Sequence, residues 1–316
     1  MNLVGAFIKM IRLPNLFFIA LTQILFHIAV LDTILLPLGT RPSIDGLNFI
    51  LLVVSSVLIA AAGYIINDYF DINIDQINKP TANVVDKIVS RRWAMAWHFV
   101  LSGVGILLSA WVAWRTGFWY ILLGNFMCVV LLFGYSVSLK RKLLFGNILI
   151  SLLTAWVILV IGLAEFTSPV FTSSKIVEAS GKIIRISFLY GGFAFISSLI
   201  REAIKDIEDM QGDEKYGCRT MPIVWGVNSA KVYIAVWLVV ILALLIILQV
   251  YVARFEWWWA MTYSIVFIIG PFVIIFLQLY KAKDQKDYHR LSNLTKLVML
   301  TGILSMIFFY FYIGTR

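Results

Sequence analysis

The chain has 316 residues, of which 61% are hydrophobic and 14% are charged, and its mean hydropathy is +0.91. An ordinary soluble domain is about 45–50% apolar and about 25% charged. This composition excludes a soluble globular enzyme, a disordered chain and a disulfide-rich secreted module. The net charge of +9 does not by itself indicate nucleic acid, because cytoplasmic loops of membrane proteins carry an excess of Lys and Arg.

Continuous apolar runs of the length that an α-helix needs to cross a bilayer divide the chain. A transmembrane β-barrel would instead show alternating segments of about ten residues. The sequence therefore predicts an all-α polytopic membrane protein, with nine transmembrane helices in a single bundle and one intramembrane domain over residues 1–316. The apolar runs are 13–37, 46–66, 94–114, 117–138, 146–165, 183–200, 230–252, 257–279 and 295–313.

The basic residues predict the orientation of this bundle. Nine spans put the two termini on opposite sides, and 19 of the 26 Lys and Arg residues fall on the side of the N-terminus. Positive charge is retained on the cytoplasmic side of membranes. The N-terminus and the loops after the even-numbered spans are therefore expected in the cytoplasm, and the Ser- and Thr-rich segment 167–180 is expected to be an external loop.

A cluster of acidic residues follows the second span, in the stretch NDYFDINID that begins at Asn67. Its three carboxylates, Asp68, Asp71 and Asp75, stand at positions i, i+3 and i+7. On a helix these positions share one face, and Asn67 borders it. Like charges on one face repel each other, so the arrangement is unfavourable unless a cation or a donor cluster neutralises it. Taken alone, the stretch could also be a solvated helix end.

The stretch DIEDMQGD after the sixth span repeats this spacing with Asp206, Asp209 and Asp213. A second copy on the same side of the membrane makes a plain helix end a poor explanation. Six carboxylates at one face suit Mg²⁺, which binds oxygen ligands together with substrate phosphates. Thiolate and imidazole clusters are absent from the sequence, which argues against zinc. The two motifs therefore predict a phosphate or diphosphate bridged by Mg²⁺.

Basic side chains accompany both acidic motifs. Arg201 and Lys205 lie one to two turns before the second motif, and Lys140 and Arg141 follow the fourth span shortly after Tyr135. Such groups could bind diphosphate oxygens around a metal. For Arg141, anchoring of the membrane topology is an equally good explanation.

The paired motifs resemble those of the UbiA-type intramembrane prenyltransferases, and nine helices is that family's architecture. The form of the second motif is most similar to digeranylgeranylglyceryl phosphate synthase-like members of the family. The resemblance covers nearly the whole chain. It is carried by RLPN at 12–15, NDYFDINIDQINKP at 67–80, the segment 135–140, REAIKDIEDMQGD at 201–213, and YG and RTMP at 216–222.

The resemblance implies Mg²⁺-dependent transfer of a prenyl group from an isoprenyl diphosphate to an acceptor. Geranylgeranylglyceryl phosphate is the first expected acceptor, and an aromatic quinone precursor (4-hydroxybenzoate, homogentisate or dihydroxynaphthoate) is the alternative. Two Mg²⁺ ions would bridge the diphosphate through the ligands Asn67, Asp68, Asp71, Asp75, Asp206, Asp209 and Asp213. The candidate catalytic residues are Asp71, Asp75, Asp209, Lys140 and Tyr135. The candidate substrate-binding residues are Arg12, Asn15, Tyr64, Lys140, Arg141, Arg201 and Lys205.

The expected chemistry places two demands on the site. The departing diphosphate needs positive charge, which the metal ions, Lys140, Lys205 and Arg12 would supply. The allylic fragment becomes cation-like, and aromatic faces stabilise cations. Water must also be kept away, so the cytoplasmic segments 78–92 and 214–228 are expected to fold as caps. The aromatic candidates are Tyr64, Tyr69, Phe70 and Tyr135.

Two other functions are compatible with a polytopic membrane protein. An ion-coupled transporter would need carboxylates near the bilayer midplane, whereas the acids here gather at the ends of the spans. A phosphatidyl-group transferase would concentrate its aspartates in one extended motif with Asp-Gly and Ala-Arg elements, and the first motif has neither. Membrane lipid is an expected partner and nucleic acid is not, and the oligomeric state is not indicated.

Overall fold

The computed structural model describes residues 3–78, 85, 88–167 and 174–313. Within this part of the chain, nine helical segments are long and apolar enough to cross a membrane, which confirms the predicted bundle. They are Leu13–Leu38, Gly46–Phe70, Arg91–Thr116, Trp119–Val137, Phe145–Phe166, Ser174–Glu208, Val227–Ala253, Trp258–Lys281 and Gln285–Ile313.

The spans consist of long helices that are extended or joined by short ones. The long helices are α2 (Leu13–Leu25), α4 (Gly46–Phe70), α6 (Arg91–Thr116), α7 (Trp119–Val137), α8 (Phe145–Thr167), α9 (Ser174–Glu208), α12 (Val227–Ala253), α14 (Gly270–Lys281) and α15 (Gln285–Leu304). The short ones are α1 (Leu3–Met10), α3 (Thr33–Leu35), α5 (Ile72–Asn78), α10 (Met210–Lys215), α11 (Met221–Trp225), α13 (Trp258–Ser264) and α16 (Ile307–Ile313). Two π-helical turns, η1 (Phe26–Asp32) and η4 (Ile265–Ile269), and two 3-10 turns, η2 (Leu36–Leu38) and η3 (Leu139–Arg141), complete the set.

Two spans begin well before their predicted apolar runs. The sixth begins at Ser174, so the expectation of an external loop over 167–180 is wrong for the part from Ser174 onward. The ninth begins at Gln285, where Asp284 and Asp287 form a capping box that starts the helix. Hydropathy misses both extensions because helical turns that leave the hydrocarbon region can carry polar side chains.

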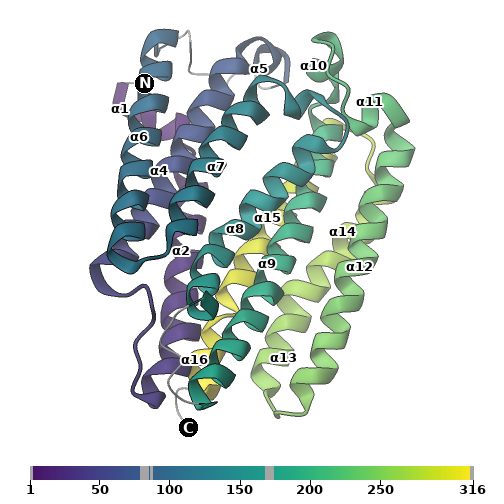
Figure 1. The fold of residues 1–316 in the computed structure, drawn as a ribbon. Coiled ribbons are helices and arrows are strands. Elements are labelled where there is room, and N and C mark those ends of the chain that lie inside the picture. Colours follow the sequence, from purple (N-terminus) through teal and green to yellow (C-terminus); the bar gives the residue numbers. More distant parts are fainter. Residues whose placement is uncertain (1–2, 79–84, 86–87, 168–173, 314–316) are drawn as a thin grey trace.

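The helices form a bundle in which the two acidic motifs come to the same end. Helices α4, α6 and α7 pack together on one side, α8, α9 and α15 occupy the middle, and α12 and α14 form the other side (Figure 1). The short helices α5 and α10, which carry the last aspartate of each motif, lie at the end of the bundle where α1 lies. The C-terminal helix α16 lies at the opposite end.

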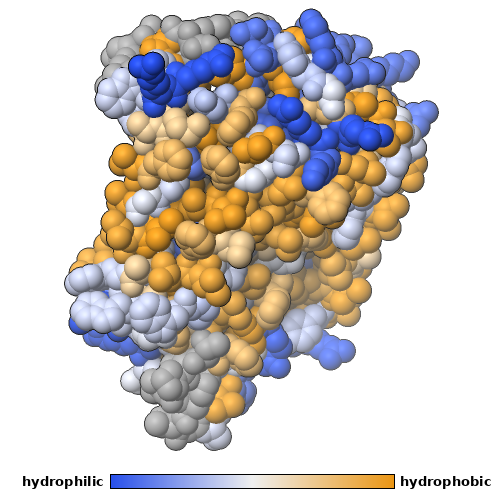
Figure 2. Space-filling view, turned by 45° about the horizontal axis from the view of Figure 1, so that its top comes forward, coloured by the Kyte–Doolittle hydropathy of each residue, from blue (hydrophilic) through white to orange (hydrophobic). Residues whose placement is uncertain are grey.

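The outer surface of the bundle is that of a membrane protein. Figure 2 shows a broad hydrophobic belt, with hydrophilic residues concentrated above it at the end that carries the motifs. Large apolar side chains such as Leu107, Leu123 and Ile247 are about two-thirds exposed, at 69%, 65% and 64%. Monomeric soluble proteins rarely expose apolar patches of this extent, whereas a bilayer covers them.

Helices inside the bundle are joined by close packing and by polar contacts. A Cβ atom at Gly162 would lie 1.9 Å from Ser187 Oγ, so α8 and α9 approach this closely only because residue 162 is glycine. A buried polar cluster joins α4, α6 and α7: the Ser55 and Ser109 hydroxyls are 2.7 Å apart, and Asn125 Nδ2 donates to Ser109 Oγ at 2.8 Å. These contacts fix the wall that carries the first motif.

The two segments predicted as caps lie at the motif end. Most of segment 78–92 falls outside the described residues, but Val85 and Val89 are buried in one apolar cluster with Ala6 and Met10 of α1. Segment 214–228 contains the end of α10, the whole of α11 and a connecting turn. In that turn the Arg219 backbone N–H donates to the carbonyl of Arg141, at 2.8 Å. Their action as caps stays a prediction.

Candidate active site

The two acidic motifs have the same backbone shape as well as the same spacing. Helix α4 ends at Phe70, Asp71 takes φ −94° and ψ 3°, and α5 begins at the next residue. In the second motif α9 ends at Glu208, Asp209 takes φ −94° and ψ 2°, and α10 follows. These angles lie in the sparsely populated bridge region, where many active-site residues are found. Each motif is therefore a helix interrupted at its middle aspartate, and the repeat in sequence is a repeat in structure.

One asparagine joins the two motifs directly. The Asn78 side chain, at the end of α5, donates to the carbonyl of Asp209 and accepts from the backbone N–H of Gly212, each at 2.8 Å. A Cβ atom at Gly212 would lie 2.5 Å from Asn78 Oδ1. Glycine is required there, and these contacts hold α5 and α10 side by side.

Two basic side chains contact the carboxylates of the first motif. Arg12 Nη2 donates to Asp68 Oδ1 at 2.7 Å. Lys140 Nζ donates to Asp71 Oδ1, and it donates to Asn67 Oδ1 at 3.1 Å. Burial is the largest effect and opposes the charge of Arg12, but Asp68, Tyr64 and Asp75 together outweigh it, so the pKa of Arg12 lies above its ordinary value. The guanidinium therefore stays charged in the site.

The turn after α7 places Lys140 beside these carboxylates. Helix α7 ends at Val137, the 3-10 turn Leu139–Arg141 reverses the chain, and α8 begins at Phe145. A Cβ atom at Gly146 would lie 3.0 Å from Lys140 Cα and 3.1 Å from a ring carbon of Tyr135. Helix α8 can therefore start close under this turn because residue 146 is glycine.

The second motif is held by contacts from α8 and within α9. Asn147 Nδ2 donates to Asp206 Oδ2 at 2.9 Å. One turn earlier, Glu202 Oε1 accepts from Arg201 at 2.8 Å, and Glu202 Oε2 lies 3.6 Å from Lys205 Nζ. This face of α9 therefore presents both acids and bases to the interior of the bundle.

A cavity of about 270 Å³ opens below the motifs. Its polar end is lined by groups from five helices and by Arg12, the residue before α2; among these groups are Tyr64, Asn67 and Tyr135. Tyr135 lies between the motifs, within electrostatic reach of Asp71 and of Asp206. The ring of Tyr64 faces the Arg12 guanidinium, at 5.1 Å from its centroid. An anionic group is thus suited to this end.

The remaining part of the cavity lining is largely apolar and includes a tryptophan. Ile59 and Leu132 line its middle, and Trp156 lies further along α8, away from the motifs. Trp156 Nε1 donates to Asn125 Oδ1 at 3.1 Å, and a Cβ atom at Gly124 would lie 2.2 Å from the Trp156 ring. The indole is therefore packed tightly against α7.

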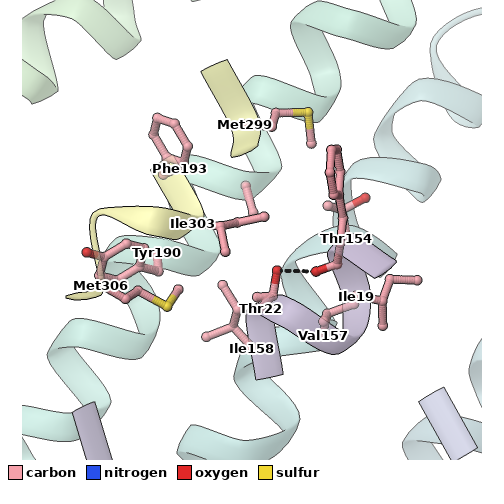
Figure 3. Close-up of a pocket in the computed structure, with 12 residues that line it drawn as sticks. Ile19, Thr22, Thr154, Val157, Ile158, Tyr190, Phe193, Met299, Ile303 and Met306 are labelled. Carbon is pink, nitrogen blue, oxygen red and sulfur yellow. Dashed lines mark hydrogen bonds between the residues drawn. The ribbon is translucent and has the colours of Figure 1, made fainter. Parts of the chain in front are cut away.

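A smaller apolar pocket of about 80 Å³ adjoins this cavity and shares lining residues with it, among them Ile19, Val157 and Met299. Figure 3 shows the side chains of Ile303 and Met306 closing it from the side of the C-terminal helices. Methionine side chains are flexible and adapt to irregular apolar shapes. Together the two spaces can accommodate a long hydrocarbon chain.

The UbiA prenyltransferase family matches residues 16–312 of the chain. The chain belongs to this family. It is 30% identical, over 246 residues, to a curated digeranylgeranylglyceryl phosphate synthase from Methanosphaera stadtmanae. The alignment covers 77% of this chain and 81% of that relative.

Two solved structures show that the fold is that of UbiA-family proteins. One solved structure, whose description concerns digeranylgeranylglyceryl phosphate synthase in membranes, matches this chain with a TM-score of 0.62. The two sequences are 23% identical, and the match covers 96% of this chain and 98% of that one. The structure of a UbiA homolog from Archaeoglobus fulgidus bound to GPP and Mg²⁺ matches with a TM-score of 0.56 and 14% sequence identity. That match covers 95% of this chain and 99% of the homolog. Family membership confirms the prediction of an integral membrane prenyltransferase and leaves the transporter alternative without support.

The donor atoms of this UbiA-family site are of the kind that Mg²⁺ prefers. Both motifs offer carboxylate and amide oxygens, without thiolate or imidazole among them. Among the residues that the structure describes, no three Asp, Glu, His or Cys side chains converge as a ready-made metal site. Instead, Arg12 and Lys140 contact two of the carboxylates. The residue types therefore fit Mg²⁺, and the carboxylates could hold it after exchanging these basic partners.

The structure brings most of the predicted site residues together at one end of the bundle, but not all. The substrate-binding candidates that line the cavity are Arg12, Asn15, Tyr64, Arg201 and Lys205. Arg141 is exposed and is not among the lining residues; its described hydrogen bonds are made by its backbone, with Ser138 and Arg219. Tyr69 and Phe70 are also not lining residues, and their rings pack against each other at 5.1 Å.

Four polar residues of the site were missed by the sequence analysis: Asn78, Asn147, Glu202 and Lys296. Lys296, on α15, lines the cavity and donates to Asn15 Oδ1 at 2.6 Å. One signal was available for it, because a charged residue within a transmembrane run is a functional candidate by default. The two asparagines carry no comparable signal, since an amide near a helix end is common.

Proposed function

We propose that this UbiA-family protein transfers a prenyl group from an isoprenyl diphosphate to a glyceryl phosphate lipid, with Mg²⁺ as cofactor. The observation that carries this proposal is the cavity itself: its polar part reaches Asn67 of the first motif and Lys205, which directly precedes the second, and the rest of it runs between helices. The names of the relatives support the acceptor, and the GPP and Mg²⁺ of the Archaeoglobus fulgidus homolog support the donor and the cofactor.

The diphosphate of the donor would bind at the polar end. In the proposal the first motif holds one Mg²⁺ through Asn67, Asp68, Asp71 and Asp75, and the second holds another through Asp206, Asp209 and Asp213. Bound there, the metal would neutralise charge on the diphosphate. Lys140 and Arg12, which reach the first motif, would bind the oxygens that become more negative as the diphosphate departs.

The prenyl group would lie along the apolar end of the cavity. As its bond to the diphosphate breaks, positive charge develops on the allylic carbon. The acceptor hydroxyl oxygen bonds to that carbon, and the hydroxyl proton passes to an oxygen of the departing diphosphate. Tyr135 lies between the motifs and could stabilise this charge with its ring. The surrounding helices exclude water, which would otherwise hydrolyse the reactive fragment.

The proposal also includes the orientation of the protein and its organisation. The motif end, with the N-terminus and the segments 78–92 and 214–228, would face the cytoplasm, as the distribution of Lys and Arg indicates. Residues 1–316 would form one catalytic domain. Scanning single-cysteine variants with a membrane-impermeant maleimide would test the orientation, since residues at the motif end should react only in inverted vesicles.

The experiment that tests the reaction is a donor and acceptor panel on the purified protein. Radiolabelled geranylgeranyl diphosphate would be supplied with Mg²⁺ and with geranylgeranylglyceryl phosphate, 4-hydroxybenzoate, homogentisate or dihydroxynaphthoate. The proposal predicts an ether-lipid product that EDTA abolishes. A product formed from an aromatic acceptor would support prenyl transfer but contradict the glyceryl phosphate acceptor. Transfer that persists in EDTA would contradict the role of Mg²⁺.

A further inference from the structure

Three basic side chains line the cavity on the wall opposite the first motif. Arg201 and Lys205 project from α9, and Lys296 projects from α15. All three are partly buried, and Arg201, Lys205 and the nearby Arg12 are close enough to Lys296 to act on its charge. We call Arg201, Lys205 and Lys296 the cavity triad.

The contacts around the triad leave positive charge in excess. Arg201 and Lys205 share a single carboxylate, that of Glu202. Lys296 donates to the neutral amide oxygen of Asn15 and lies 5.2 Å from the ring centroid of Phe18. Counting Arg12 with its partner Asp68, these four basic side chains have two carboxylates within ion-pair distance among the described residues, so two positive charges lack a direct carboxylate partner. Asp206 acts on Lys205 only from beyond that distance. Such groups are normally paired when they are buried.

The triad also has unused hydrogen-bonding capacity. Among the described residues, Arg201 Nε is a buried nitrogen without a hydrogen-bond partner. A guanidinium presents five donors in a planar fork that matches phosphate oxygens, and a lysine adds a mobile point charge. The cavity wall thus offers donors for which the protein supplies too few acceptors, which is the property of an anion site.

We propose that the cavity triad binds a phosphate monoester, the head group of the lipid acceptor, at a site separate from that of the donor diphosphate. This proposal deepens the proposed function and rests on it for the identity of the acceptor. It assigns Arg201 and Lys205 to the acceptor, although their sequence positions indicated the diphosphate, and it adds Lys296.

Charge favours a phosphate monoester over the alternatives. A phosphate monoester carries a charge of about −1.5 to −2 at pH 7, which matches the two unbalanced positive charges. The carboxylate of an aromatic acceptor would balance only one. The donor diphosphate already has Lys140, Arg12 and the carboxylate motifs at its disposal. The triad lies next to the apolar part of the cavity, so a lipid bound there could extend its chain among the helices.

The first test measures binding without turnover. Purified protein without donor would be titrated with geranylgeranylglyceryl phosphate and, in parallel, with the dephosphorylated geranylgeranylglycerol. The wild type should bind the phosphate form at least about ten-fold more tightly, because hydrogen bonds to charged groups are the strong ones. In Lys296→Met this preference should fall about ten-fold, and Lys296→Arg should restore most of it.

The matched control is Lys286→Met. Lys286 lies on the same helix, is exposed and does not line the cavity, so its loss should leave the preference unchanged. Steady-state kinetics supply a second readout: Lys296→Met should raise the KM for the acceptor and leave the KM for the donor unchanged. If the Lys296→Met protein is misfolded and does not elute as a monodisperse peak in gel filtration, the same two tests would be made with Lys205→Gln.

Three outcomes separate this inference from the proposed function. Equal binding of the phosphate and the alcohol by the wild type would overturn the inference, whatever the reaction. If Lys296→Met raises only the KM for the donor, the triad binds the diphosphate. That result would also overturn the inference, while the proposed prenyl transfer would stand. Triad-dependent binding of the phosphate without transfer to it would support the site and contradict the proposed acceptor.

Discussion

The backbone N–H of Gly212 donates to Oδ1 of Asn78 at 2.8 Å, and this contact joins two acidic motifs that lie far apart in the sequence. The same asparagine donates to the carbonyl of Asp209, the residue at which the second motif bends. The distance between the motifs therefore depends on one side chain and on one glycine without a Cβ atom. Several consequences of this geometry can be measured.

Gly212→Ala should slow transfer without unfolding the protein. The added Cβ would lie 2.5 Å from Asn78 Oδ1, so α5 and α10 must move apart. Since placement of catalytic groups contributes strongly to rate, we expect kcat to fall about ten-fold to a hundred-fold. Gly217→Ala, at a position where a Cβ would meet no neighbour but φ is +71°, would control for strain in the same segment. Unchanged kcat in Gly212→Ala would contradict the role of this contact.

Lys140→Met should impair the use of the donor more than that of the acceptor. The variant keeps the length of the side chain and removes the charge that contacts Asp71 and Asn67. Loss of one preorganised donor to a developing negative charge costs about 10²–10³ in kcat. The measurement is kcat and KM for each substrate, and Arg141→Met is the control, because the adjacent Arg141 side chain is exposed. If Lys140→Met has the same kcat and the same KM for the donor as the wild type, Lys140 does not bind the diphosphate.

Asp71→Asn and Asp209→Asn should have matching effects, because the two residues occupy equivalent bends. Each substitution keeps the shape of the side chain and removes one charge that would bind metal. We expect transfer to fall by at least about 10² at ordinary Mg²⁺ and to recover in part at high Mg²⁺, since second-shell and ligand changes weaken metal affinity by about 10–100-fold. Titration of Mg²⁺ against rate measures this, and an unchanged Mg²⁺ dependence would refute metal binding by these residues.

Trp156→Ala should allow longer donors to react. The indole lines the cavity more than two helical turns along α8 from its first residue, Phe145, and is held by Asn125 and by contact with Gly124. Removing it would lengthen the apolar space, so kcat/KM for a five-isoprene donor should rise relative to the four-isoprene donor. Trp114→Ala is the control, because Trp114 is 64% exposed on the outer surface. An identical chain-length preference in both variants would mean that another group limits the donor.

Gly162→Ala should destabilise the bundle, whereas Gly192→Ala should not. At Gly162 the added Cβ would lie 1.9 Å from Ser187 Oγ, while at Gly192 nothing lies within 4 Å. Overpacking typically costs about 1–3 kcal/mol, and alanine in an open helical position gains up to about 1 kcal/mol over glycine. Thermal unfolding in detergent should therefore show a lower Tm for Gly162→Ala only. A lowered Tm for both would mean that the helix contact is not the cause.

The bundle and its motifs could be predicted because their signals are local. Each span is a run long enough to cross hydrocarbon, so hydropathy finds it without knowledge of its neighbours. The spacing of Asp68, Asp71 and Asp75 likewise defines one helical face, and its repetition marks a shared chemistry. Even the bend at the middle aspartate occurs in both copies. The spans that were misjudged, at Ser174 and Gln285, extend into polar turns where that signal ends.

Which side chains line the cavity was decided only by the tertiary structure. Lys296 meets Asn15 across 281 residues, and Asn78 meets Gly212 across 134. Hydropathy identifies helices but does not say which helices are neighbours, or how far each is rotated about its axis. Which helices are neighbours and how they are rotated depends on side-chain packing. For example, the missing Cβ of Gly162 leaves room for the Ser187 side chain. The sequence by itself determined that acids and bases gather at one membrane face, and the packing of the helices determined which of them share a cavity.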